Sequence, residues 1–247
     1  ALFLYRLSAR RSLSKSMSKK SEKILSLYEV CALKRGGDPG KPFAPGVLNS
    51  DLGSRSYQEI VEIFEDRINR WYFNVAEEIQ HKIADYNFAV VILCSTILDL
   101  MSQYAYAVPV SGESVFKKFF REYLGEYNYD IDPPITSCYF NKRRKKWLKE
   151  TIKDVADGFY HCFRCGVVHS AGILEYGRIS TRYPGEAVKI VKWGDGQQEI
   201  NVNPVEFLRL LKRIFADYIR RLKEEEFLPK KNFIEKFKLE YGVSVPE

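Results

Sequence analysis

Residues 87–107 read NFAVVILCSTILDLMSQYAYA and contain the longest apolar run of the chain. A membrane-spanning helix needs about 20 predominantly apolar residues. The run itself covers residues 88–101, which are 14 residues, and its polar side chains are Ser95, Thr96 and Asp99. We therefore predict a helix over residues 86–104 that is apolar nearly all round and forms the buried centre of a helical bundle.

Two further helices flank this segment in the sequence. Ser56 and Glu59 have the spacing of a capping box, which predicts a helix that begins there and leads towards His81, extended or broken near Tyr72. Its apolar residues recur at helical intervals: Ile60, Ile63, Phe64, Ile68 and Trp71. A second, short helix is expected over residues 113–124. Its inward residues are Val115, Phe116, Phe119, Phe120 and Tyr123.

A longer amphipathic helix is predicted from Asn141 onward, in NKRRKKWLKETIKDVADGFYHCFRCGVVHS. The preceding pair Pro133-Pro134 is expected to stop regular structure. The apolar residues of the new segment step by three and four and cluster on one side of an ideal helix: Leu148, Ile152, Val155, Phe159 and Cys162. Gly166 follows on the same line and allows close packing or a local break.

The hydrophobic period changes after Gly172. Residues 187–193, the turn 194–196 and residues 197–202 predict a β-hairpin. Asn203 and Pro204 then start a long helix that reaches about Glu226. Its stripe consists of Leu208, Leu211, Phe215, Tyr218 and Leu222, and a short helix over residues 232–239 follows. The predicted fold is mainly α: a helical bundle with a small β-hairpin between the Arg164 helix and the last long helix.

The first 53 residues are predicted to be an arm and linker ahead of a helical domain over residues 54–247. Residues 36–53 are rich in Gly and Pro, as loops are. Residues 1–20 contain no acidic side chain and resemble an organellar transit peptide, although a vector-derived leader over residues 1–16 explains them equally well. This segment therefore carries no prediction of localisation.

Composition bounds the class of protein. The formal net charge is +7, and such an excess attracts polyanions without specifying a fold. The odd number of cysteines is typical of reduced thiols in a cytoplasm and not of a disulfide framework: Cys31, Cys94, Cys138, Cys162 and Cys165. No membrane association is expected.

The sequence Arg164-Cys-Gly-Val-Val-His169 contains the residues of the chain best suited to catalysis. RNA cleavage without a metal uses the 2′-OH to attack the adjacent phosphate. Histidine suits the proton transfer because its pKa lies near neutrality. Arginine suits the developing negative charge, because its planar fork donates two parallel hydrogen bonds to phosphate oxygens. Arg164 and His169 are therefore the candidate catalytic residues.

The motif and its context resemble the HEPN superfamily, helical-bundle proteins that include many ribonucleases of defence and toxin systems. The likeness lies in FYHCFRCGVVHS, with its R-x4-H spacing, and in the apolar segment 87–107, and it covers roughly residues 56–222. It implies a metal-independent endoribonuclease without a cofactor. Its expected partners are RNA, a second copy of the chain, and an antitoxin or other regulatory protein. Many members carry a polar residue where this chain has Cys165, and some toxins carry a modified Tyr where it has Ala171.

The spacing of the motif imposes a geometric condition. Residues five apart on an ideal α-helix differ by about 140° in direction. Arg164 and His169 can act together if the helix loosens at Gly166, or if a second chain completes the site. The resemblance implies the second arrangement, with two Arg–His pairs meeting about a two-fold axis.

Supporting residues are expected around this pair. Asp99 is a carboxylate in the most apolar helix, where it either makes a core hydrogen bond to a tyrosine or the backbone, which we favour, or orients Arg164 or His169. His161 and Cys165 are further candidates near the pair. Together with Cys162 and His169 they also spell H-C-x2-C-x3-H, but a structural zinc site usually pairs two such clusters, so we expect no metal.

A basic run completes the candidate RNA surface. Its residues, Lys142, Arg143, Arg144, Lys145 and Lys146, are expected to contact phosphates. Tyr139, Phe140 and Trp147 flank the run and could stack on bases, although a solvated surface is the commoner role of such a run. The leading prediction is a dimeric endoribonuclease. The alternatives are a non-catalytic module that binds nucleic acid or a partner protein, and a structural zinc-binding bundle.

Overall fold

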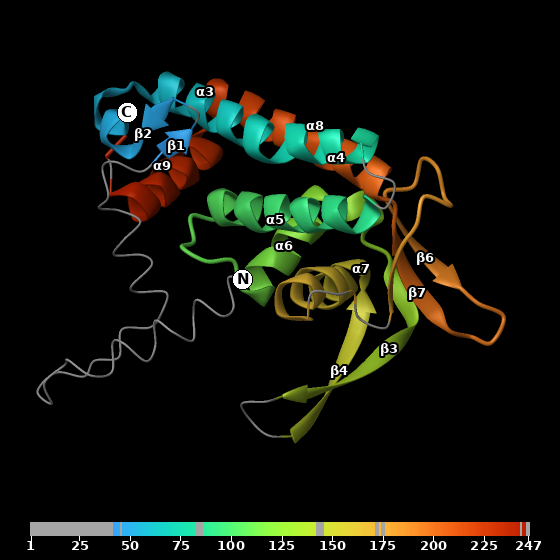
Figure 1. Ribbon diagram of the computed structural model, residues 1–247. Coiled ribbons are helices and arrows are strands. Elements are labelled where there is room, and N and C mark those ends of the chain that lie inside the picture. The colour runs from blue at the N-terminus through green and yellow to red at the C-terminus, as the bar shows by residue number, and fades with distance from the viewer. Residues whose placement is uncertain are drawn as a thin grey trace, which may run out of the picture.

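The protein is mainly helical, as the sequence predicts. The computed structural model describes residues 42–44, 46–82, 86–141, 146–170, 173, 176–242 and 244–245, with side chains except at 42, 82, 137–148, 150 and 167–170. Helices α3 (Tyr57–Ile68), α4 (Asn74–Lys82) and α8 (Pro204–Lys223) form one layer over the central helix α5 (Asn87–Ala105) (Figure 1). Beneath α5 lie α6 (Glu113–Tyr123), α7 (Val155–Gly158) and the helical segment η4 (Phe159–Ser170).

Helix α5 is the centre of the core, as predicted. It contacts α4, α6, α8, α9 (Phe227–Tyr241) and η4. It buries apolar side chains on several sides, so its apolar character all round reflects packing against several helices. By length and composition it is the one helix in the described part of the chain that could cross a membrane, but 56% of that window is buried inside the protein. Such burial is typical of the core helix of a soluble protein.

The first long helical stretch contains a π-helical turn that shifts its register. Ser56 caps α3 as predicted, and its hydroxyl accepts a hydrogen bond from Glu59 N–H at 3.3 Å. The π turn η2 (Asn69–Phe73) then joins α3 to α4. Because a π turn inserts one residue into the helical repeat, Phe73 is fully buried while Trp71 is 37% exposed. The predicted inward position of Trp71 was therefore wrong.

Several other elements confirm the predictions from sequence. Phe116, Phe119 and Phe120 are buried on α6, and strands β6 (Val188–Lys192) and β7 (Gln198–Val202) form the expected antiparallel hairpin. Asn203 caps α8 by accepting from Val205 N–H at 3.1 Å, with Pro204 in the first turn. All five predicted stripe residues of α8 are buried. The hairpin gains a third strand, β5 (Gly177–Ile179), which pairs with β7 in parallel.

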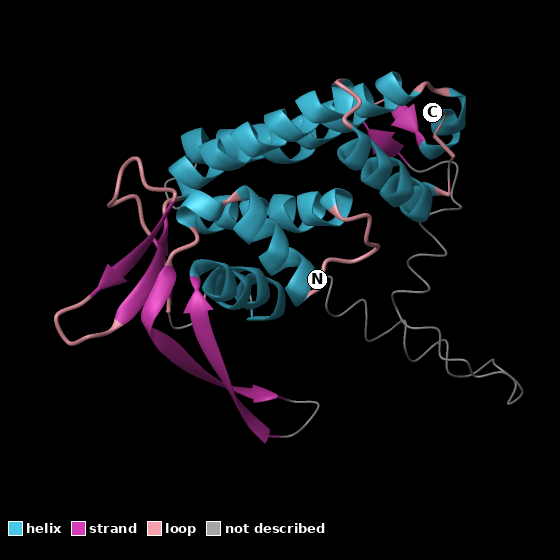
Figure 2. Cartoon of the chain, turned by 180° about the vertical axis from the view of Figure 1, so that it is seen from behind, coloured by secondary structure: helices cyan, strands magenta, loops and turns pink. Residues whose placement is uncertain are grey.

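The predicted long helix from Asn141 was wrong over its first half. Strands β3 (Asp130–Asn141) and β4 (Lys146–Asp154) form an antiparallel ribbon there, and the helix begins only at Val155. The ribbon runs away from the helical layers (Figure 2). Pro133-Pro134 lie within β3 and interrupt its register without ending it, since prolines in strands are confined to edges and bulges.

The true start of the motif helix is a side-chain cap. The Asp154 carboxylate accepts from Asp157 N–H at 2.8 Å, which ends β4 and begins α7. Ile152 and Val155 both point into the core, from a strand and from a helix respectively. Because the two residues are three apart, their spacing matches that of one helical stripe, and for this reason the sequence wrongly predicted a single helix across both.

Part of the predicted N-terminal linker packs on the helices. Strands β1 (Pro42–Ala44) and β2 (Val47–Leu48) pair, and the 3-10 segment η1 (Asn49–Ser54) follows. Phe43 and Leu52 are buried. Residues 42–54 therefore contribute to the core. The possible leader over residues 1–16 lies outside the described residues.

Candidate functional site

Arg164 is held at the contact between η4 and α5. Its Nε and Nη2 donate to Asp99 Oδ1, both at 3.3 Å, and Nη2 also donates to the backbone carbonyl of Ser111 at 3.3 Å. The side chain is 18% exposed and that of Asp99 is 24% exposed. Asp99 therefore takes the alternative that the sequence left open, direct contact with Arg164, and Arg164 retains access to solvent.

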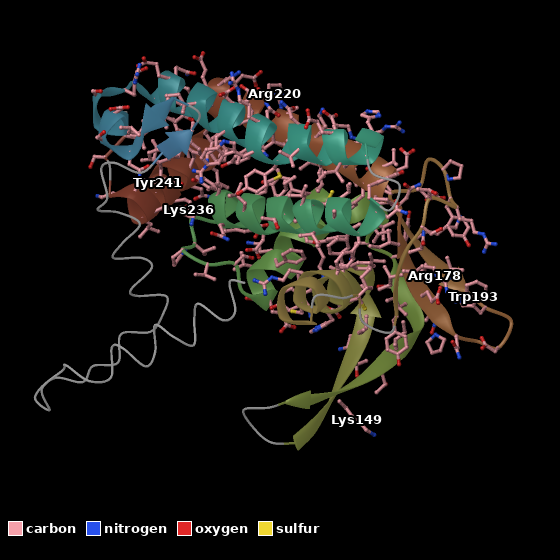
Figure 3. The ribbon with its side chains drawn as sticks, viewed as in Figure 1. Lys149, Arg178, Trp193, Arg220, Lys236 and Tyr241 are labelled. Carbon is pink, nitrogen blue, oxygen red and sulfur yellow. The ribbon has the colours of Figure 1, made fainter. Side chains whose placement is uncertain are left out.

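Both acceptors of Arg164 are themselves fixed. Gln103 donates to Asp99 Oδ2 at 3.0 Å and accepts from the buried Lys236 at 3.0 Å. Figure 3 labels Lys236 on α9. Ser102 donates to the Ser111 hydroxyl at 2.8 Å, which ties the loop before α6 to α5. A hydrogen-bonded chain thus runs from α9 through α5 to the guanidinium. No sequence pattern pointed to Gln103 or Lys236, because their roles depend on tertiary contacts.

The backbone of η4 brings Arg164 and His169 into register. Residues 159–170 are π-helical, so each carbonyl pairs with the amide five residues later. The positions of Arg164 and His169 are therefore about one turn apart on the same side of the helix, which corresponds to the alternative of a helix that loosens near Gly166. Long π-helical segments are rare, and π turns are frequent at functional sites. The side chain of His169 lies outside the described residues.

Tyr160 and Cys165 border Arg164. The Arg164 Cζ atom lies 5.4 Å from the centre of the Tyr160 ring, a cation–π distance. Burial raises the pKa of the Cys165 thiol, although the nearby Tyr160 and Arg164 oppose this effect. Burial also raises the pKa of Tyr160 above its ordinary value. Cys165 is therefore a protonated thiol at neutral pH, unsuited to act as a nucleophile.

His161 lies on the other side of Tyr160. The two rings meet edge to face with centroids 5.2 Å apart. Nε2 of His161 is 3.4 Å from Lys117 Nζ and 3.8 Å from Glu113 Oε1, both on α6. Burial, together with the charge of Lys117, lowers the pKa of His161. The imidazole is therefore neutral at pH 7.

A network of charges that the sequence did not reveal anchors the start of α7, just before η4, to α6. Lys117 Nζ bonds to Glu113 at 2.6 Å and to Asp157 at 2.9 Å. Arg121 bonds to Asp154 at 2.9 Å and to Asp157 at 3.0 Å. Burial opposes the charge of Lys117, but its two carboxylate partners raise its pKa. Two sequence signals could have indicated this network. Asp154 and Asp157 have the spacing of a helix cap, and Lys117 and Arg121 stand four residues apart on one face of α6.

Along the sequence, the predicted phosphate-binding run stands between strands β3 and β4. Residues 142–145 lie outside the described residues, and so does the side chain of Lys146. Along the chain they connect Asn141, where β3 ends, to β4. Lys149, the nearest described side chain, is exposed on β4 (Figure 3).

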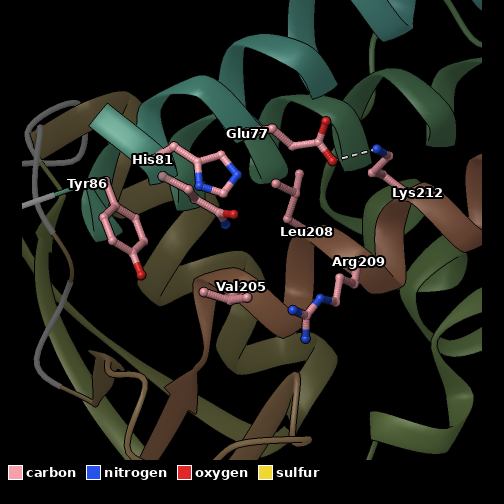
Figure 4. Close-up of a pocket in the computed structure, with 8 residues that line it drawn as sticks. Glu77, His81, Tyr86, Val205, Leu208, Arg209 and Lys212 are labelled. Carbon is pink, nitrogen blue, oxygen red and sulfur yellow. Dashed lines mark hydrogen bonds and ion pairs between the residues drawn. The ribbon is translucent and has the colours of Figure 1, made fainter. Parts of the chain in front are cut away.

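A pocket of about 330 Å³ lies between α4 and α8, away from this cluster (Figure 4). His81, Tyr86 and Arg209 line it, and the ion pair of Glu77 with Lys212 closes one side. None of the predicted site residues takes part. Among the described side chains no group of three or more His, Cys, Asp or Glu residues gathers as metal ligands do.

No model of a known protein family, no curated protein and no solved structure matches this chain. Its function has to be inferred from the residues themselves. Three features near Arg164 carry chemistry: a partly exposed guanidinium, the backbone position of His169 one π-helical turn away, and a neutral imidazole at His161.

Proposed function

We propose that this chain is a metal-independent endoribonuclease of the HEPN type, with a role in defence or in a toxin-like system. The observation that carries the proposal is the π-helical register of η4, which brings the positions of Arg164 and His169 to one side of a helix. The Asp99 contact adds to it, because a guanidinium fixed before substrate binds needs no reorganisation during the reaction.

The chemistry follows from these two side chains. The 2′-OH of a nucleotide attacks the adjacent phosphorus, and a 2′,3′-cyclic phosphate and a 5′-OH result. Arg164 stabilises the negative charge that grows on the phosphate oxygens, and His169 transfers a proton. DNA lacks the 2′-OH and is not a substrate of this route.

Two copies of the chain form the active enzyme in this proposal. Pairing about a two-fold axis brings two Arg–His pairs to one phosphodiester and leaves room for a regulatory partner, such as an antitoxin. The thiols of Cys94, Cys162 and Cys165 are free, which fits a reducing, cytoplasmic compartment. The basic run 142–146 and the net charge of +7 would draw RNA towards the protein.

A second candidate function is a non-catalytic module that binds nucleic acid or a partner protein. The observation that favours it is the β3–β4 ribbon, which extends from the body of the protein (Figures 1 and 2). Along the sequence, the basic run connects its two strands. A two-stranded ribbon is one of the elements that enter a nucleic-acid groove. In this case Arg164 would serve only to join η4 to α5.

Incubation of the purified full chain with RNA in EDTA tests the two functions. We expect cleavage by the unchanged protein, products with cyclic phosphate ends, and no cleavage of the matching DNA. Arg164→Ala and His169→Ala should both abolish the activity. RNA binding without cleavage would favour the module, and cleavage that survives both substitutions would remove this pair from the mechanism.

A further inference from the structure

Lys236 carries an ammonium group that is almost completely removed from solvent, where α9 packs on α5, and 2% of its side chain is exposed. A buried charge is unfavourable unless its neighbours compensate it. We infer that Lys236 is a positioning residue of the candidate site, and that its ammonium holds both acceptors of Arg164 in place. Its effect on RNA cleavage rests on the proposed ribonuclease function, whereas its effect on the orientation of Arg164 does not.

Three oxygen atoms surround this ammonium. They belong to the side chain of Gln103 at 3.0 Å, the backbone carbonyl of Pro109 at 3.4 Å and the carboxylate of Glu240 at 3.0 Å. An ammonium has three N–H donors, so each oxygen can be matched by one donor. Gln103 lies on α5 and Pro109 in the segment that follows it, while Glu240 lies on α9 itself. Lys236 therefore joins α9 to α5 and to the segment between α5 and α6.

The first route from Lys236 to Arg164 passes through the Gln103 amide. An ammonium can only donate, and an ionised carboxylate can only accept. The amide therefore turns its oxygen to Lys236 and its nitrogen to Asp99, at 3.0 Å in each case. The reversed amide would oppose donor to donor and acceptor to acceptor. Lys236 thus fixes the direction of the amide, and the amide fixes the carboxylate that accepts from Arg164.

The second route passes through the segment between α5 and α6. Lys236 donates to the carbonyl of Pro109, two residues before Ser111. The carbonyl of Ser111 accepts from Arg164 Nη2 at 3.3 Å. The conformation of this short segment therefore decides where the second acceptor of Arg164 lies. One ammonium contacts the supports of both acceptors.

Stability alone does not explain a charge at this place. A buried ion pair is often no more stable than apolar residues of the same volume, because both ions lose their hydration. The surroundings would suit an apolar side chain. Nζ of Lys236 is 5.7 Å from the centre of the Tyr104 ring, which in turn packs on Phe233 with centroids 5.5 Å apart. What the ammonium adds is a set of directed donors.

Two variants with opposite expected effects test the assignment. Lys236→Met/Glu240→Gln removes both members of the ion pair, so neither charge is left buried without its partner. Its Tm should equal or exceed that of the unchanged protein, while kcat for RNA cleavage falls about tenfold at unchanged KM. Glu240 lies on neither route. Glu240→Gln alone should therefore keep kcat within about threefold, even if its Tm falls. Full kcat in the double variant would overturn the inference.

A measurement without RNA follows the orientation of Arg164. Its Nε–H donates to Asp99, so the NMR signal of this group should exchange slowly with water in the unchanged protein. The signal is assigned by its absence from Arg164→Lys. Exchange should be about fivefold faster or more in Lys236→Met/Glu240→Gln, and nearly unchanged in Glu240→Gln. Equal exchange rates in the three proteins would contradict the assignment.

A further variant keeps the test decisive if the double variant does not fold. Gln103→Glu can still accept from Lys236, but it cannot donate to Asp99, so it interrupts the first route and preserves the contact with α9. Exchange at Arg164 Nε–H should accelerate as in the double variant. An unchanged exchange rate in folded Gln103→Glu would remove this route from the inference and leave Lys236 a structural residue.

Controls keep the outcomes distinct. Lys231→Met removes an exposed lysine from the same helix and should change neither kcat nor the exchange rate. Circular dichroism and thermal unfolding establish that each variant folds. If the unchanged protein cleaves no RNA, the ribonuclease function fails, and the exchange rates still decide the role of Lys236. If cleavage requires Arg164 while kcat and exchange are indifferent to Lys236, only this inference fails.

Discussion

Asp99 Oδ1 accepts two hydrogen bonds from Arg164, both at 3.3 Å, and this single contact joins the central helix to the motif segment across 65 residues of sequence. Asp99 Oδ2 accepts from Gln103 at 3.0 Å, so both carboxylate oxygens have partners. The carboxylate orients the guanidinium instead of merely neutralising it. Arg164 is therefore presented in one conformation, with part of its side chain open to solvent.

Loss of the Asp99 charge should loosen Arg164. Asp99→Asn keeps the shape of the side chain, but a hydrogen bond to a charged group contributes about 1.5–3 kcal/mol. We expect RNA cleavage to fall about tenfold or more, measured as kcat, while the protein remains folded. Asp66→Asn is the matched control, because Asp66 makes a surface ion pair with Arg70. Equal effects of the two substitutions would refute a special role for Asp99.

The planar fork of Arg164 should matter as well as its charge. Arg164→Lys keeps the positive charge but cannot donate two parallel hydrogen bonds to a phosphate. We expect this variant to lose nearly as much kcat as Arg164→Ala, with the larger loss in kcat and the smaller in KM. Near-normal activity of Arg164→Lys in the same assay would mean that the charge alone suffices.

A dimeric site predicts interference between active and inactive chains. Excess Arg164→Ala chain should lower the activity of a fixed amount of unchanged chain, because mixed dimers then replace active ones. Cleavage per chain should also fall on dilution, at the concentration where sedimentation shows the dimer dissociating. Activity that is indifferent to both treatments would place the whole site in one chain.

The sequence predicts the parts of this fold that depend on local chemistry. Two helix starts lie where predicted, and the residues that cap each of them are at most three apart in the chain. They are Ser56 with Glu59 and Asn203 with Pro204. The apolar run of α5 likewise predicts that this helix is buried, as it is. Each of these signals is contained within a few residues, so no knowledge of the tertiary structure is needed.

Other features depend on contacts that no local pattern records. Trp71 lies on the predicted stripe, but a π turn moves the buried position to Phe73. Ile152 and Val155 share a helical spacing although a strand ends between them. At the candidate site, Asp99 contacts Arg164, which is the less favoured of the two alternatives that the sequence left open. Lys117 remained hidden because its partner Asp157 lies 40 residues away in the sequence.

Gly158 should favour close packing of the motif segment on the sheet. A Cβ atom at this position would lie 1.9 Å from Cδ1 of Ile200 on β7, which is impossible without movement. Overpacking of this kind costs about 1–3 kcal/mol. We therefore expect Gly158→Ala to lower Tm by about 2–4 °C for each kcal/mol lost. Gly125→Ala, at a site with no atom within 4 Å, should leave Tm nearly unchanged.

The buried imidazole of His161 should make folding stability depend on pH. Burial and then the charge of Lys117 lower its pKa in the folded protein, whereas the unfolded chain has the ordinary value of 6.5. The unfolded state therefore binds the extra proton first as pH falls. The stability that the neutral imidazole provides is complete above pH 6.5 and declines below it, until the folded pKa is reached.

Thermal or urea unfolding at a series of pH values from 7.5 to about 5 measures this decline. The unchanged protein should lose more stability over that interval than His161→Gln, whose side chain does not titrate. Parallel curves for the unchanged protein and His161→Gln would show that His161 titrates alike in both states. The imidazole would then be partly protonated near neutrality.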